Sequence, residues 1–410
     1  MMLFISDGER IHYGFSQKLI KNSNSTLLFN LIRKEMPISR AALAKKTRLS
    51  PTTVSILIDE MIQNKWICET GPGENSDRGR KPILLEVNAS RGYVITIEIY
   101  SGGYKCTLYD ICLKKIGDIG VRMATYNSRD ICSTISELLE AKHIVHDRLI
   151  GIHVIFPGLF DAETGKLRFS VVIPFDEMVD TNVVEVLKEQ FAKAIVMISN
   201  NGGVIAFSEF IAEGDNAGVP LLSVNIDEGI SGGMVLNDAR NNTKICLPLE
   251  IGHIIVDNDG PPCKCGNRGC LETLCSTPAL FHALNERAGL GLKFRETFGA
   301  ECNHAAMEIA ASHFRAKDPK AMPVFQDYVY KLCCGLVSVV NLCNIKCIHI
   351  GGSISKLGSD FADLIRQTLR EHFVMLNASL DISLELFSND NERICRTAAI
   401  MTMDELFKNS

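Results

Sequence analysis

Glu250-Ile-Gly-His253 is followed by Cys263-Lys-Cys265-Gly266-Asn-Arg-Gly269-Cys270-Leu-Glu272, and this stretch decides how the rest of the chain is understood. One imidazole and three thiols make a complete tetrahedral ligand set for zinc. The two glycines permit the backbone reversal that brings the three cysteines together, and His253 can return to them across a short loop. The alternative is a set of ordinary small buried residues, but closely spaced cysteines with a histidine favour a metal site.

Two carboxylates flank the predicted metal ligands. Glu250 lies three residues before His253, and Glu272 lies two residues after Cys270. Four protein ligands leave no open position for an activated water, so the zinc would be structural rather than hydrolytic. A metal that braces this loop would hold both carboxylates in place, which predicts a site for a polar ligand beside the zinc.

Length and charge distribution indicate several domains that differ in net charge. At 410 residues it exceeds what one hydrophobic core usually supports, so two or three domains are expected. Residues 16–88 carry 12 Lys or Arg and 7 Asp or Glu, a net charge of +5 that leaves −10 for the rest of the chain. A basic module joined to an acidic body is expected of a DNA-binding head on a sensor or an enzyme.

The number and distribution of the cysteines indicate the cellular compartment. The 15 cysteines are odd in number and scattered, unlike a secreted disulfide framework, so we expect a reduced, cytoplasmic protein. No apolar run approaches the roughly 20 residues that cross a bilayer, and the first residues do not read as an export signal. Neither export nor a membrane partner is predicted.

The basic segment has the pattern of a helix-turn-helix. Apolar residues recur at helical spacing in a first helix, which Pro37 and Ile38 close. Ser39 is the predicted N-cap of a short helix that ends at Thr47, and Ser50-Pro51 opens the next helix. Two helices joined by about three residues match the spacing of this motif. Many such turns have glycine where this chain has Arg48, a difference that costs only about 1 kcal/mol.

The second helix of this motif supplies the predicted DNA-reading face. Its apolar stripe is expected to be buried, which leaves four polar residues near its start for a major groove: Ser50, Thr52, Thr53 and Ser55.

A hairpin follows, with strands at 66–70 and 82–87, and is the predicted wing. Its tip carries Arg78, Arg80 and Lys81, which would bind the DNA backbone or a minor groove. The alternative for the tip alone is a solvated polar loop. Trp66 is predicted to belong to the core of this unit.

From residue 92 onward, strand and helix patterns alternate. Strands are predicted near 93–100, 104–109, 149–156, 194–199, 221–225 and 347–350, and helices near 184–191, 322–343 and 361–373. This alternation predicts an α/β fold with largely parallel sheets and ligands at the strand ends.

The chain resembles the ROK family (repressors, open reading frames and sugar kinases) over essentially its whole length, and more narrowly its repressor branch. The Glu-x-x-His and Cys-x-Cys-Gly-x-x-Gly-Cys-x-Glu runs carry the resemblance, with weaker support from Pro157-Gly158 and Gly351-Gly352. It implies a two-lobed, actin-like and ribonuclease-H-like body behind a winged helix-turn-helix. The expected domains are 1–88 for the DNA-binding head, 89–200 for the first lobe and 201–410 for the second, with the final helix returning to the first lobe.

The resemblance also implies site residues. Zinc would be held by His253, Cys263, Cys265 and Cys270. A sugar would be bound by Asn200, Glu250, His253 and Glu272, and we expect Asn201 to hold a sugar hydroxyl as well.

Three departures from the active kinases of the family argue against catalysis. Tyr100 stands where the kinases have a glycine that approaches phosphate. Asn201 replaces the aspartate that serves as general base, a group typically worth about 100- to 10,000-fold in rate. Asp227 and Glu228 place two carboxylates in the second phosphate turn, where they would repel a triphosphate. ATP is therefore not expected as a cofactor.

These observations predict a sugar-responsive transcriptional repressor with a catalytically inactive effector domain. Its partners would be operator DNA, a monosaccharide or sugar derivative, and further copies of itself in a homodimer or homotetramer, since a symmetric dimer fits a palindromic operator. Two alternatives remain at this point. One is a sugar kinase with a regulatory DNA-binding head, and the other is a repressor that has lost its sugar and responds to a protein partner.

Overall fold

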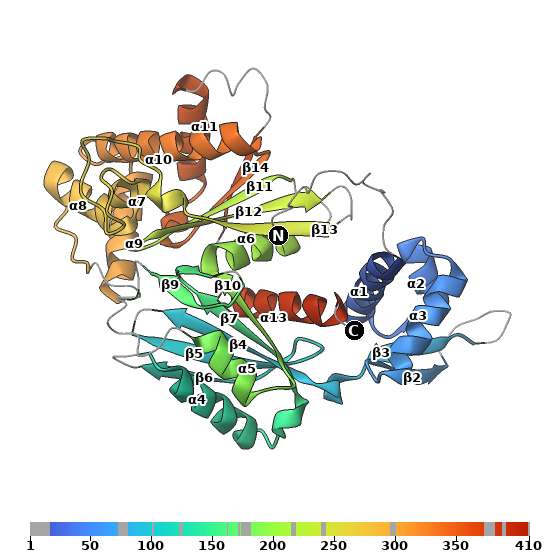
Figure 1. Cartoon of the computed structure of the whole chain (residues 1–410). Coiled ribbons are helices and arrows are strands. Elements are labelled where there is room, and N and C mark those ends of the chain that lie inside the picture. Colours follow the sequence, from blue (N-terminus) through green and yellow to red (C-terminus); the bar gives the residue numbers. More distant parts are fainter. Residues whose placement is uncertain are drawn as a thin grey trace, which may run out of the picture. The chain divides into compact units, whose positions relative to one another are not determined.

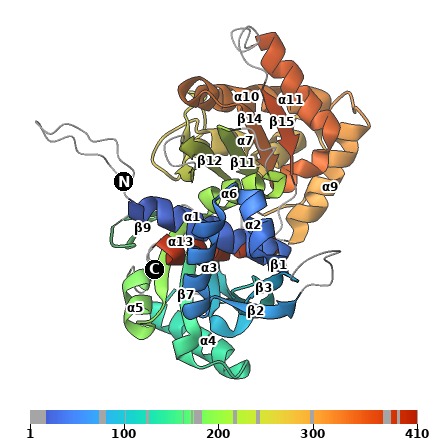
Figure 2. The ribbon, with the colours of Figure 1, turned by 90° about the vertical axis from the view of Figure 1, so that its right-hand side faces the viewer.

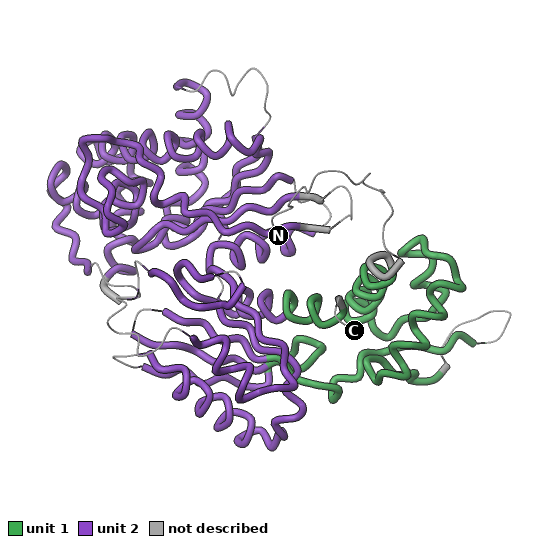
Figure 3. The backbone as a smooth tube through the Cα atoms, viewed as in Figure 1, with its two compact units in different colours: residues 1–94, 109–115, 400–410 green, residues 95–108, 116–399 purple. Residues whose placement is uncertain are grey.

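The computed structural model describes most of the chain, namely residues 17–72, 81–100, 102–122, 126–161, 163–170, 173, 182–214, 219–238, 243–295, 301–372, 382–387 and 391–408. They form two compact units (Figure 3). The first comprises residues 1–94, 109–115 and 400–410, and the second comprises residues 95–108 and 116–399. Within the described ranges, no helix is both long and apolar enough to cross a bilayer.

The first unit consists of helices and a small sheet. The helices are α1 (Gln17–Glu35), α2 (Arg40–Thr47) and α3 (Pro51–Gln63). The antiparallel sheet has the order β1-β3-β2, with β1 (Ile38–Ser39), β2 (Ile67–Pro72) and β3 (Ile83–Val87). The sequence predicted the hairpin strands, but β1 is only two residues long and carries no pattern of its own.

The starts of α2 and α3 follow from their capping residues. The hydroxyl oxygen of Ser39 accepts a hydrogen bond from the backbone N–H of Ala42 (3.2 Å), and that of Ser50 accepts one from Thr53 (3.0 Å). Arg48 ends α2 in the left-handed region, with a φ of 57°. These contacts confirm the predicted helix starts and the tight turn between them.

An aromatic cluster forms part of the core of the first unit. Trp66 is only 7% exposed, as predicted, and its ring centroid lies 6.1 Å from that of Phe29 and 4.9 Å from that of Phe407. Phe407 belongs to α13 (Asn391–Lys408), whose residues up to 399 belong to the second unit. Nearby, the side-chain amide of Asn30 donates a 2.9 Å hydrogen bond to Asp404. The first unit is therefore completed by residues from the last helix of the chain.

The first sheet of the second unit has the order β10-β7-β4-β5-β6. Its strands are β4 (Tyr93–Tyr100), β5 (Gly103–Asp110), β6 (Lys115–Arg122), β7 (Leu149–Phe156) and β10 (Ile195–Asn200), with β7 and β10 parallel. Helices α4 (Ser128–Ala141) and α5 (Val183–Gln190) cover one face, and α13 lies on the other (Figures 1 and 2). A two-stranded ribbon, β8 (Leu159–Phe160) with β9 (Leu167–Phe169), follows β7.

The second sheet has the order β13-β12-β11-β14-β15. Its strands are β11 (Leu221–Ile226), β12 (Ile230–Asp238), β13 (Thr243–Leu249), β14 (Cys347–Gly351) and β15 (Ser383–Leu386). Strands β11, β14 and β15 are parallel, but β12 and β13 are antiparallel to their neighbours. The prediction of largely parallel sheets is wrong for this one, because a direct β11–β12–β13 meander was not recognised.

Helices enclose the second sheet. Helix α6 (Asn201–Glu213) packs on β11, β12 and β13. The other face forms one hydrophobic core with α7 (Leu271–Cys275), α8 (Thr277–Ala288), α9 (Glu301–Arg315), α10 (Met322–Cys343) and α11 (Ser359–His372). Figure 1 shows these helices on the side of the sheet opposite α6.

Two glycines let α6 approach the sheet closely. A Cβ atom on Gly202 would lie 2.2 Å from the carbonyl oxygen of Gly232, and one on Gly233 would lie 2.3 Å from that of Gly202. Gly232 and Gly233 are strand residues of β12. Their lack of side chains serves the packing of α6 against the sheet.

Candidate functional site

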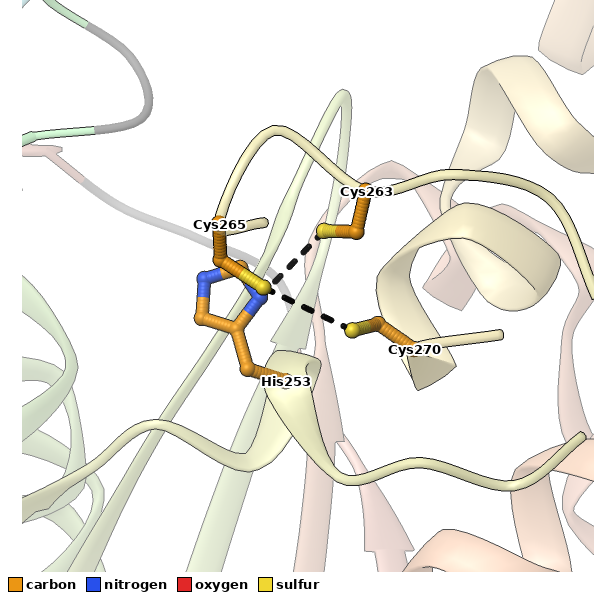
Figure 4. Close-up of side chains that lie close together, drawn as sticks. All are labelled: His253, Cys263, Cys265 and Cys270. Atoms are coloured by element: carbon orange, nitrogen blue, oxygen red, sulfur yellow. Dashed lines mark hydrogen bonds between the residues drawn. The ribbon is translucent and has the colours of Figure 1, made fainter. Parts of the chain in front are cut away.

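Four side chains meet in one cluster. The ligand atoms of His253, Cys263, Cys265 and Cys270 all lie within 4.8 Å of one another. Figure 4 shows them converging, with 3.7 Å between Cys263 Sγ and His253 Nδ1 and 3.7 Å between Cys265 Sγ and Cys270 Sγ. A tetrahedral zinc with Zn–S bonds of about 2.3 Å has ligand-to-ligand separations of about 3.8 Å. The residues therefore fit a tetrahedral metal ion without rearrangement of the backbone.

A short irregular hairpin positions the three thiols. The backbone N–H of Cys263 donates to the carbonyl of Asn267 (2.8 Å), and that of Gly269 donates to Pro261 (2.8 Å). Gly269 has a φ of 62°, and a Cβ atom there would lie 1.5 Å from the carbonyl oxygen of Asp257. Only glycine fits at this position, which accounts for its place between the cysteines.

Two carboxylates flank this cluster in the sequence. Glu250 directly follows β13 and precedes the short helix 251–253, while Glu272 lies in the first turn of α7. Glu272 Oε2 accepts a 2.9 Å hydrogen bond from the backbone N–H of Ile230, so it is anchored to the start of β12. The carboxyl of Glu250 is partly desolvated, which raises its pKa; His253 opposes this rise and Glu272 adds to it.

Asn200 and Asn201 lie at the junction of β10 and α6. Asn200 caps the helix, because its Oδ1 accepts from Gly202 N (2.8 Å), and its Nδ2 donates to the carbonyl of Gly158 (3.0 Å). The Oδ1 atom of Asn201 is buried and makes no hydrogen bond with any described residue. Since α6 packs directly on β12, the asparagines and Glu272 share that strand as a common support.

The hydroxyl of Tyr126 makes hydrogen bonds with the turn between β4 and β5. The hydroxyl of Tyr126 donates to the carbonyl of Tyr100 and accepts a 3.0 Å hydrogen bond from the backbone N–H of Gly103. This N–H lies in the turn that resembles the first phosphate turn of the kinases. Tyr126 was not singled out from the sequence, because nothing in its local pattern indicates a contact across 23 residues.

Asp227, in the turn between β11 and β12, also accepts hydrogen bonds from other parts of the chain. Its Oδ1 accepts a 2.5 Å hydrogen bond from the backbone N–H of Ser353, which follows the Gly351-Gly352 turn. Its Oδ2 accepts from the side-chain amide of Asn225 (2.9 Å). Glu228 accepts a 2.9 Å hydrogen bond from Asn303 Nδ2. The sequence marked both carboxylates as repulsive to phosphate, but their hydrogen-bond partners could not be foreseen.

The predicted DNA-reading residues are all in the first unit. Ser50 and Thr52 are exposed at the start of α3, whereas Thr53 and Ser55 are partly buried there. Lys81 is exposed just before β3. Arg78 and Arg80 lie outside the described residues.

The fold and the site together define a class. Two packed α/β lobes, with candidate ligand residues at the ends of β10 and β13 and glycine turns beside them, are the architecture of actin-like sugar kinases and of the repressors related to them. A family model described as ROK family matches residues 99–404. The chain therefore belongs to the ROK family, as its sequence predicted.

Known proteins agree with this assignment. The xylose repressor of Bacillus subtilis (strain 168) is 26% identical over 379 residues, which is 89% of this chain and 93% of the relative. A crystal structure of a ROK family transcriptional regulator, a homolog of the Escherichia coli MLC protein, covers 95% of this chain and 97% of its own, with 24% identity and a TM-score of 0.73. A ROK hexokinase from Thermus thermophilus covers 77% of this chain and 99% of its own, with 19% identity and a TM-score of 0.57. These likenesses confirm the predicted α/β, actin-like fold.

Proposed function

We propose that this protein is a sugar-responsive, DNA-binding transcriptional repressor of carbohydrate metabolism. The curated relatives that match most of its length, the xylose repressor among them, are repressors by name, whereas the ROK hexokinase matches 77% of the chain. A regulatory head joined to an effector-binding body accounts for both likenesses. A protein that acts on bacterial DNA and keeps its thiols reduced belongs in the cytoplasm.

One observation carries the effector part of the proposal. The site keeps polar groups suited to sugar hydroxyls, while its phosphate turns are engaged by groups of the protein itself. Asn201 Oδ1 is buried without a hydrogen-bond partner among the described residues, an arrangement that costs about 1–3 kcal/mol unless a ligand satisfies it. We propose that Asn200, Asn201, Glu250, His253 and Glu272 hold the sugar.

The same groups argue against phosphoryl transfer. Asn201 carries an amide where a kinase needs a carboxylate base. Asp227 binds the backbone N–H of Ser353, and Tyr126 binds that of Gly103, so neither N–H is available to a phosphate oxygen without displacing an internal partner. We propose that the body binds sugar and does not phosphorylate it.

The cluster of His253, Cys263, Cys265 and Cys270 fits zinc. We propose that a structural zinc ion binds there and fixes the Glu250–His253 segment against α7. Its contribution is to hold the loop in one conformation, so that Glu250 and Glu272 present fixed hydrogen-bond acceptors.

The head would bind operator DNA. We propose residues 1–88 as the DNA-binding domain, with Ser50, Thr52, Thr53 and Ser55 facing base edges and Arg78, Arg80 and Lys81 on the backbone or minor groove. Residues 89–200 and 201–410 would form the two lobes. A homodimer or homotetramer would place two heads on a palindromic operator, and sugar binding would change their spacing.

A thermal-shift screen tests the effector part. The zinc-loaded wild type and the Glu250→Ala variant are each heated with a panel of monosaccharides, amino sugars and sugar phosphates. A ligand at 100 times its Kd adds about 2.7 kcal/mol to the free energy of unfolding, which is readily measured. The exposed Glu140, at the far end of α4, provides the matched control as Glu140→Ala.

The outcomes separate the candidate functions. Stabilisation that Glu250→Ala abolishes and Glu140→Ala keeps supports the sensor, and the same sugar should then alter operator binding. A protein that binds operator but no sugar would point to the repressor that responds to a protein partner. ATP-dependent phosphorylation of the sugar would overturn the proposal in favour of a kinase.

A further inference from the structure

A second group of potential metal ligands lies at the opposite end of α6 from the candidate sugar site. Its members are Glu213 at the end of α6, and Cys347 and His349 on β14, and their ligand atoms all lie within 4.8 Å of one another. Residues two apart on a strand share a face, so Cys347 and His349 both point from the sheet toward α6. Glu209 and Glu213, four apart on α6, share the facing side of the helix.

The side chains in this group are removed from water. His349 is 2% exposed, Cys347 is 3% exposed and Glu209 is 4% exposed. Both ring nitrogens of His349 are buried without a hydrogen bond of good geometry to any described residue, although carboxylate oxygens face both of them. Glu213 Oε1 lies against Nε2, and Glu209 Oε2 is 3.8 Å from Nδ1. The imidazole of His349 therefore lies between two carboxylates, with the thiol of Cys347 on the same face of the strand, and a metal ion bound there would take the place of the proton that the imidazole and the carboxylates otherwise share.

We propose that Glu213, Cys347 and His349 form a second metal site, which binds zinc or a chemically similar divalent transition metal. A thiolate with an imidazole selects such metals over Mg²⁺ and Ca²⁺, and a carboxylate completes many zinc sites. The side chain of Glu213 is 23% exposed, so one of the three ligands can be reached from solvent.

Glu209 has a different part in this site. Its Oε2 faces Nδ1 of His349, and its Oε1 pairs with Arg393 of α13, so it is held as the carboxylate that orients a ligating imidazole. Carboxylate–histidine–metal arrangements of this kind fix the tautomer and the ring orientation of the ligand. The metal would thereby clamp the end of α6 to the start of β14, at the far end of a helix about 18 Å long from Asn201.

Metal counting on the full-length protein tests the proposal without reference to sugar or DNA. The chain is equilibrated with zinc, freed of excess metal by gel filtration and measured by mass spectrometry for zinc per chain. The expected result is about two zinc ions per chain for the wild type and about one for Cys347→Ser. Cys333→Ser, a buried cysteine of α10 outside both clusters, is the matched control and should keep both ions.

A second variant guards against misfolding. Glu213→Gln changes a partly exposed side chain at a helix end, so it should fold, and it should also bind about one zinc ion per chain. Cobalt loading adds a spectroscopic readout, because loss of Cys347 removes one thiolate-to-cobalt charge-transfer contribution while the thiolate bands of the three-cysteine site remain. If wild type, Cys347→Ser and Glu213→Gln all bind the same number of ions, the proposal is wrong and the cluster is a protonated histidine between two carboxylates.

Discussion

The carboxylate of Asp227 accepts a 2.5 Å hydrogen bond from the backbone N–H of Ser353, across 126 residues of sequence. It thereby joins the turn after β11, which resembles the second phosphate turn of the kinases, to the glycine turn after β14. The carboxylate is half-buried and ties these two turns together, and on the proposed function it would also repel phosphate oxygens and so disfavour ATP.

This contact predicts that restoring the general base does not restore a kinase. Asn201→Asp should show no ATP-dependent phosphorylation of any sugar the protein binds, because the backbone groups at Ser353 and Gly103 stay engaged. A coupled assay of ADP release with saturating sugar measures this, with the wild type as the control. Turnover well above the wild-type background would show that Asn201 alone had silenced the site.

Loss of one thiol should empty the first metal site. Cys270→Ser should lower the zinc content by one ion per chain and reduce the free energy of unfolding by more than about 4 kcal/mol, since loss of a structural metal is among the largest single effects. Metal analysis and thermal unfolding measure the two quantities. Cys334→Ser, in α10 and outside the cluster, should change neither. An equal zinc content in both variants would exclude Cys270 as a ligand.

The aromatic cluster predicts that a substitution in α13 strongly destabilises the first unit. Phe407→Ala should destabilise that unit by about 3–5 kcal/mol, because it removes a buried ring that packs on Phe29 and Trp66. Trp66 is the only tryptophan, so its fluorescence during urea unfolding reports on this unit. Leu342→Ala, at a residue that is 86% exposed in α10, should leave the transition unchanged.

Operator binding should distinguish the roles of two exposed residues. Lys81→Ala should weaken binding to all DNA sequences and reduce the salt dependence by about one unit of slope, as expected for a lost phosphate contact. Thr52→Ala should instead weaken binding to the operator more than to unrelated DNA. Fluorescence anisotropy at several salt concentrations measures both, with Lys317→Ala as the surface-charge control. A Lys81→Ala slope equal to that of the wild type would place this lysine outside the interface.

The burial of His153 predicts that the free energy of unfolding depends on pH. Its ring is fully buried on β7, and this desolvation lowers its pKa to about 4 despite a backbone hydrogen bond with Ala398. His153 takes up a proton near pH 6.5 in the unfolded chain but only near pH 4 in the folded chain. The neutral ring therefore contributes its full share of the free energy of unfolding above pH 6.5, and this share is lost as the pH falls toward 4. The loss from this group amounts to about 3 kcal/mol.

Chemical denaturation between pH 4 and pH 7 checks this expectation. His153→Gln should show a shallower decrease in the free energy of unfolding than the wild type over this window, whatever its stability at pH 7. Parallel curves for the two proteins would mean that His153 titrates alike in the folded and unfolded states.

Local signals made much of this structure predictable. Ser39, Ser50 and Pro51 specify helix starts through contacts with residues two or three positions away, and the knuckle of Cys263, Cys265 and Cys270 closes within eight residues. Their side chains meet as the spacing predicted, because short-range geometry leaves few alternatives.

The contacts that were not foreseen are long-range. Strand β12 was not recognised because Gly232 and Gly233 have no side chains to form an alternating pattern, and their role depends on the backbone of α6. The pairing of Asp227 with Ser353 and the packing of Phe407 on Trp66 join segments whose own sequences carry no sign of each other. The second cluster, at Glu213, Cys347 and His349, exists only once the end of α6 reaches the side chains of β14.

The packing of Phe407 against Phe29 and Trp66 has a consequence for synthesis of the chain. Asn30 and its partner Asp404 are 374 residues apart, so the helices of the head leave the ribosome long before the residues that complete their core. During translation the first unit therefore lacks part of its core until residues 400–410 have emerged. A message cut short before α13 would yield a polypeptide with α1, α2 and α3 but without the ring of Phe407 that completes their core, so this unit would have a lower free energy of unfolding.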